Sequence, residues 1–177
     1  YLIIYLQHYL KIESYALVLG IVLIAASAVS LVGGRMIDRV GKLKFVFPAA
    51  AVMLAGLVGM FLVRGAAGAV IAGSVMMSGY MLLTASLSAE VRDFTPREKA
   101  GHFQGIRMIF AVLLPMVIGP FIGAAVIKNS GSTYVDLGVV KNVPTPSIFL
   151  ASAAALLFVA IPVLLIRRRE RRENHMG

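Results

Sequence analysis

Hydroxyl and thioether side chains gather on one side of the segment 65–89. At 100° per residue, seven of them fall within roughly 160° of a helix circumference: Ser74, Met77, Ser78, Tyr80, Met81, Thr84 and Ser88. The opposite side is apolar apart from Ser86. Such a stripe could hydrogen-bond a neutral, hydroxylated solute in a cavity, or it could simply pack against neighbouring helices, as Ser and Thr do in membranes. We treat Ser74, Met77, Ser78, Tyr80 and Thr84 as candidate cavity-lining residues.

A second polar group lies near the start of the chain, where an apolar run over 1–10 contains Tyr5, Gln7 and His8. Tyrosine near a membrane interface is most often a belt residue, and histidine there is usually solvated. The same side chains could also contact a solute, so we add these three to the cavity-lining candidates. The run is too short to cross a bilayer, and we interpret it as the outer end of a truncated helix.

Two charged segments could form ion pairs at a membrane surface. The first, 33–44, reads Gly-Gly-Arg-Met-Ile-Asp-Arg-Val-Gly-Lys-Leu-Lys, and the second, 90–107, contains Glu90 and Arg97 around a Pro-Arg-Glu-Lys stretch. Gly34 and Gly41 would permit a tight reversal of the chain at the membrane face. Asp38 can lie against a helix N-terminus or an arginine, and basic residues attract anionic lipid.

These groups must be positioned by apolar helices, because the composition is not that of a soluble domain. Of the 177 residues, 59% are hydrophobic and 14% are charged, against about 45–50% and about 25% in soluble proteins. No Asp, Glu, Lys or Arg occurs within 14–34, 45–63, 65–89, 108–127 or 147–166. Each segment is long enough to cross the ~30 Å hydrocarbon core. The sequence predicts an all-α, polytopic transmembrane bundle with five complete spans and one truncated span.

The spans differ in polarity. Segment 45–63 has no polar side chain, and 147–166 has only two serines. We therefore expect these two helices to face lipid widely. The polar connection 129–146 predicts a small hairpin, or a loop shielding the cavity mouth, because it is rich in turn-forming residues.

The distribution of basic residues predicts the topology. Thirteen of the seventeen Lys and Arg residues lie in 33–44, 90–107 and the basic tail 167–177, and four lie on the other side. By the positive-inside rule, 33–44, 90–107 and the tail 167–177 are cytoplasmic, and the protein is a multi-pass protein of the cell membrane. The same distribution argues against nucleic-acid binding, because the charge lies between spans and not on one solvated face.

The inventory of reactive side chains argues against an enzyme. The chain has no cysteine, and its histidines are His8, His102 and His175, none at depth in a complete span. A nucleophile such as Ser78 would therefore lack a basic partner, and we expect no metal site and no cofactor beyond a possible coupling H⁺ or Na⁺.

The glycine–Asp-Arg–glycine segment resembles the signature loop of the major facilitator superfamily, and 90–107 is similar to that family's next cytoplasmic loop. The resemblance implies that residues 1–166 form the C-terminal six-helix half of a twelve-helix transporter, from the end of helix seven to helix twelve. It implies that 65–89 lines the central cavity. It also implies a conformational latch made of Gly34, Asp38, Arg39, Gly41, Lys42, Glu90 and Arg97.

The implied function is secondary active transport by alternating access. The hydroxyl stripe favours a sugar or glycoside with ion symport, while the methionines and aromatics equally suit efflux of a drug-like organic solute. A non-transporting membrane subunit is the remaining alternative. The expected partners are a small-molecule solute, a missing N-terminal six-helix half and membrane lipids, anionic at the cytoplasmic face.

Overall fold

The computed structural model describes residues 1–128, 131–136 and 138–158. Its helices and strands, in chain order, are α1 (Leu2–Ile4), the π-helix η1 (Tyr5–Tyr9), α2 (Tyr15–Val40), α3 (Lys42–Leu62), α4 (Ala66–Asp93), the 3₁₀ turn η2 (Arg97–Lys99), α5 (Ala100–Met108), the π-helix η3 (Ile109–Leu113), α6 (Leu114–Ile127), β1 (Thr133–Asp136) and β2 (Val139–Asn142). A further helix, Ser147–Phe158, follows the strands.

Four stretches are helical, long and apolar enough to cross a membrane: Tyr15–Val40, Lys42–Leu62, Ala66–Asp93 and Ala100–Ile127. They confirm the predicted all-α membrane bundle for four of the five complete spans. The fifth appears as the shorter apolar helix Ser147–Phe158. The remainder of that predicted span and the basic tail fall outside the described residues.

The helices extend past the charge-free segments that predicted them. The predicted span 14–34 continues as α2 to Val40, and 65–89 continues as α4 to Asp93. The predicted loop 33–44 is therefore helix except at Gly41, which separates α2 from α3. This corrects the role expected for Gly34, which lies inside α2 and not in a turn. Charged side chains mark where a helix leaves the lipid, but they do not end its hydrogen bonding.

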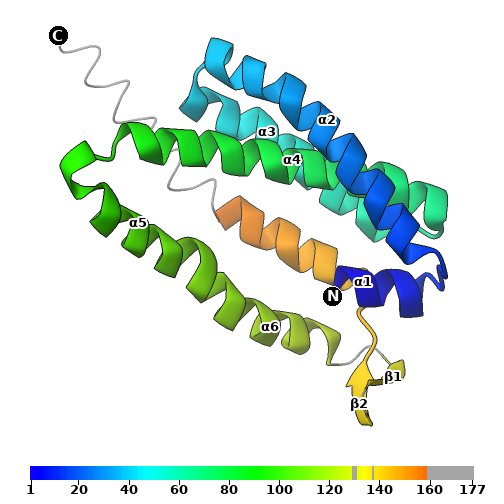
Figure 1. Cartoon of the computed structure of the whole chain (residues 1–177). Helices are drawn as coiled ribbons and strands as arrows, with labels where there is room; N and C mark the ends of the chain where they lie inside the picture. Colours follow the sequence, from blue (N-terminus) through cyan, green and yellow to red (C-terminus); the bar gives the residue numbers. More distant parts are fainter. Residues whose placement is uncertain (129–130, 137, 159–177) are drawn as a thin grey trace.

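The core of the bundle is a three-helix layer in which α4 packs against both α2 and α3 (Figure 1). Glycines on both α3 and α4 let the backbones of these two helices approach closely. A Cβ atom at Gly56 would run into the backbone of Met76, and one at Gly79 into the backbone of Met53. We call this contact the α3–α4 glycine seam. Residue numbers rise on one helix as they fall on the other, so α3 and α4 are antiparallel.

The stretch α5–η3–α6 runs apart from this layer (Figure 1). The helix Ser147–Phe158 borders both parts, because Ile148 and Ser152 line one cavity with α4 residues and another with α6 residues. Tyr1, which directly precedes α1, contacts α6: its hydroxyl donates to the carbonyl of Pro120 at 3.1 Å.

The predicted hairpin in 129–146 is confirmed. Strands β1 and β2 pair antiparallel, with Thr133 opposite Asn142 and Asp136 opposite Val139. Lys141 and Asp136 form an ion pair at 2.7 Å, and this hydrogen bond raises the pKa of Lys141. The hairpin touches the first helical segment through stacked rings of His8 and Tyr134, whose centroids are 4.5 Å apart.

Candidate functional site

A cavity of about 310 Å³ opens beside the glycine seam. The close approach of α3 and α4 sets Met53 and Leu57 of α3 next to Met76, Met77 and Tyr80 of α4. The wall is completed by Leu2, Ile148, Phe149 and Ser152. Its size matches the lower end of small-molecule sites, which are mostly apolar with a few polar groups.

Three methionines give this wall its chemical character: Met53, Met76 and Met77. Methionine side chains are flexible and polarisable, so they adapt to apolar ligands of varied shape. Polar atoms come from Tyr80, whose side chain is exposed, and from Ser152. The Ser152 hydroxyl already donates to the carbonyl of Ile148 at 2.9 Å. The cavity therefore suits an apolar or amphipathic organic molecule with few hydrogen-bonding groups.

The structure separates the predicted stripe on α4 into two groups. Met77 and Tyr80 line this cavity, whereas Ser74, Ser78 and Thr84 are not among its lining residues. Ser78 is buried, and its hydroxyl donates to the carbonyl of Ser74 at 2.6 Å. Thr84 donates to the carbonyl of Tyr80 at 2.8 Å. These two hydroxyls therefore hydrogen-bond within their own helix, as in ordinary membrane packing.

The first helical segment contacts the cavity wall through Leu2, which lines the cavity, and through Tyr5, which packs against the lining residue Phe149. Tyr5 is fully buried, and its ring meets Phe149 edge-on with centroids 5.0 Å apart. Among the described residues, the Tyr5 hydroxyl has no hydrogen-bond partner. His8 is exposed and stacks on the hairpin, and neither His8 nor Gln7 lines the described cavity.

Met53, Leu57 and Phe149 are lining residues that the sequence interpretation missed. They lie in the segments 45–63 and 147–166, which were both expected to face lipid widely. For α3 this holds on one side only, because Leu57 and Met60 are buried. The available signal was Gly56 and Gly59, because residues without a side chain let a neighbouring helix approach closely.

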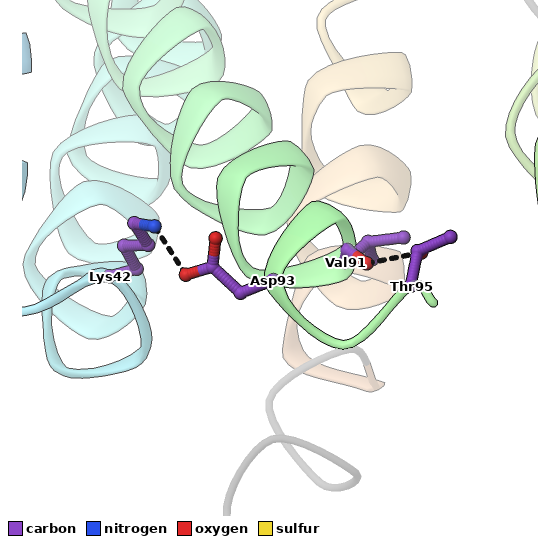
Figure 2. A network of polar contacts seen from close by, with 4 residues as sticks. All are labelled: Lys42, Val91, Asp93 and Thr95. Carbon is purple, nitrogen blue, oxygen red and sulfur yellow. Dashed lines mark hydrogen bonds and ion pairs between the residues drawn. The ribbon is translucent and has the colours of Figure 1, made fainter. Parts of the chain in front are cut away.

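A second candidate element lies at the end of the bundle where α2 and α4 finish and α3 begins, which we call the basic end. Lys42, the first residue of α3, forms an ion pair with Asp93, the last residue of α4 (Figure 2). The Thr95 hydroxyl donates to the carbonyl of Val91 at 2.6 Å and closes the last turn of α4. We call the Lys42–Asp93 pair the clasp.

The clasp contains one residue of the predicted latch and one that was not predicted. Asp38 and Arg39 are exposed, and within the described part of the chain neither forms an ion pair. Gly41 has a φ of 97°, a conformation that favours glycine, as its predicted role in the reversal requires. Glu90 lies in the last turns of α4, and the prediction for the Arg97 side chain falls outside the described residues.

The fold and its apolar helices define the class first: this is a multi-pass membrane protein. Within that class, the family model described as Major Facilitator Superfamily matches residues 1–176, and the chain belongs to that superfamily. The resemblance inferred from the charged segments is thereby confirmed. Because this family consists of membrane transporters, the match agrees with the expectation that the chain is no enzyme. Comparisons with curated proteins and with solved structures find no match.

Proposed function

We propose that this chain forms the C-terminal half of a transporter that moves a small organic solute by alternating access, and that the Met-lined cavity contributes to its solute site. The observation that carries the proposal is the wall formed by Met53, Met76, Met77 and Tyr80 beside the glycine seam. Such a wall favours an apolar or amphipathic drug-like solute, which was the alternative drawn from the sequence.

A sugar or glycoside is the second candidate. The Tyr80 side chain is exposed and on the cavity wall, where its hydroxyl would meet a polar solute group. Against a sugar, Ser78, Thr84 and Ser152 already donate to backbone carbonyls. A site for a hydroxyl-rich solute needs several free partners, because each unmet buried polar group costs free energy.

The proposal includes a partner half and an orientation. Six further helices would complete the cavity on its open side, and the basic end would face the cytoplasm of the cell, near anionic lipid. Symport with H⁺ or Na⁺ would require an ionisable group at membrane depth. Among the described residues no carboxylate lines the cavity, so we place any coupling acid in the partner half.

The test is a transport assay with the protein that the complete reading frame encodes, purified and reconstituted in liposomes. One assay uses a lipophilic fluorescent dye and another a radiolabelled hexose. Met77→Ala should weaken dye transport several-fold, because a cavity-lining side chain is truncated. Met116→Ala is the matched control, since Met116 is 70% exposed on α6 and is not among the residues lining the cavity. Equal loss in both variants, or no transport of either solute by the wild type, would contradict the proposal.

A further inference from the structure

A larger cavity, of about 450 Å³, lies between the end of α4 and the start of α5. Its wall combines basic, polar and apolar residues: Ala85, Ser88, Ala89, Val91, Arg92, Thr95, Ala100, Phe103, Gln104 and Arg107. Within the part of the chain that the structure describes, no Asp or Glu lines this cavity. Among the described residues, none lines both this cavity and the Met-lined cavity.

Arg107 is the central residue of this cavity. It lies seven positions after Ala100, so it is about 10 Å into the helix at 1.5 Å per residue. One of its guanidinium nitrogens donates to the Ser88 hydroxyl at 2.6 Å. Within the described part of the chain, it forms no ion pair with a carboxylate. An arginine side chain offers five N–H donors, so most remain available.

A partly buried cation that has no counter-charge among the described residues costs desolvation energy. An anion with several oxygens would lower that cost, because the planar guanidinium donates two parallel hydrogen bonds to a phosphate. Arg92, also on the wall, supplies a second positive charge, and the side-chain amide of Gln104 supplies a neutral donor. The polar part of the cavity thus matches a phosphate.

The apolar part of the wall indicates what the phosphate would be attached to. Ala85, Ala89 and Val91 of α4 lie opposite Phe103 of α5, which is 41% exposed. Such a surface would contact a glycerol backbone and the first methylenes of an acyl chain. We propose that this cavity binds a phosphate group through Arg107 and Arg92, and that the phosphate belongs to an anionic phospholipid. A free soluble phosphate would offer the same chemistry without using the apolar wall.

The experiment uses the full chain purified in an uncharged detergent, with bound ligand counted by native mass spectrometry. Dioctanoyl phosphatidylglycerol, dioctanoyl phosphatidylcholine and inorganic phosphate are titrated separately. We expect phosphatidylglycerol to bind most tightly, and Arg107→Gln to weaken it by about tenfold or more, as expected for a lost charge-assisted hydrogen bond. Lys44→Gln removes the same charge from the same end outside the cavity and should change binding less than about twofold.

Two further variants keep the test decisive if Arg107→Gln does not fold. Arg107→Lys retains the charge but loses the planar fork, and Arg92→Gln removes the second charge; each should weaken phosphatidylglycerol binding more than Lys44→Gln does. Tight binding of inorganic phosphate that competes with the lipid would support the site and assign it to a soluble phosphate. Equal losses in the Lys44 and Arg107 variants would overturn the proposal, because Arg107 would then only extend toward water.

Discussion

Lys42 and Asp93, which are 51 positions apart in the chain, form an ion pair that joins the start of α3 to the end of α4. Both side chains are partly exposed, at 29% and 53%. A pair at this exposure is worth about 0–1 kcal/mol. That is too little to hold the fold together, but 1 kcal/mol is enough to change the ratio of two exchanging conformations about fivefold.

We therefore expect Asp93→Asn and Lys42→Gln to change the transport rate more than they change thermal stability. The charge-swapped double variant, with Lys42→Asp and Asp93→Lys, should restore the rate, because the attraction is preserved. Transport in liposomes and thermal unfolding measure the two effects. A double-mutant cycle without coupling between the positions would rule out the clasp.

Asp38→Asn tests the latch implied by the family resemblance. In the described conformation Asp38 is exposed and pairs with no described residue, so the free energy of unfolding should change by less than about 0.5 kcal/mol. If Asp38 pairs with an arginine in another transport state, transport should slow several-fold. Unchanged initial rates across the substrate range would contradict the latch.

The glycine seam gives a prediction from one matched substitution. Gly79→Ala puts a methyl group against the backbone of Met53, whereas Gly20→Ala, inside α2, meets no atom within 4 Å. We expect the first to destabilise the protein by about 1–3 kcal/mol through overpacking. The second should be neutral or stabilising by up to about 1 kcal/mol, because alanine favours helix more than glycine does. Thermal unfolding in detergent compares them, and the opposite order would refute the seam.

Gly41 and Gly34 form a second matched pair. Gly41 has a φ of 97°, so Gly41→Ala should be strained by about 1–3 kcal/mol. Gly34 is helical, and its Cβ would meet nothing within 4 Å, so Gly34→Ala should not destabilise the protein. The midpoint temperatures of unfolding should fall for the first variant alone. A similar fall in both would mean that the turn between α2 and α3 is not the constraint.

Tyr80→Phe separates the two solute classes. Removing the hydroxyl leaves the ring and the apolar wall, so transport of a lipophilic dye should change less than about twofold. For a sugar, the loss of a hydrogen bond at a desolvated site should cost about 1–3 kcal/mol, or roughly fivefold to 150-fold in apparent affinity. Concentration dependence of uptake for both solutes measures this, and a large loss with the dye would exclude a purely apolar contact.

The membrane class and the approximate spans could be predicted from charge-free segments, but the helix ends could not. Arg35, Asp38 and Arg39 suggested a loop, yet α2 continues to Val40 because backbone hydrogen bonds form whether a side chain is charged or not. The clasp shows the same limit. Lys42 was a candidate, but the sequence offered several acids near α4, and only the register of the helices selects Asp93.

Two of the residues that the sequence nominated, Met77 and Tyr80, line the Met-lined cavity of the structure. Met53 and Leu57 were missed because α3 is apolar all round, and hydropathy cannot distinguish a side that faces lipid from a side that faces another helix. The hydroxyls of Ser78 and Thr84 do not line this cavity, although they belong to the same stripe as Met77 and Tyr80. A hydroxyl in a membrane helix can donate its hydrogen bond to a backbone carbonyl of the same helix, and the sequence does not show which acceptor it takes.

The seam between α3 and α4 has a consequence for bending, because it brings the two backbones into contact. Two helices in backbone contact move as one rigid body, since neither can tilt without the other. The stretch 100–127 is suited to bending, because Pro115, Pro120 and the π-helix η3 interrupt its regular α-helical hydrogen bonds. On this basis α3 and α4 form a rigid part of the bundle beside a more deformable helix over 100–127. The conformational strain of each transport cycle would concentrate in that helix.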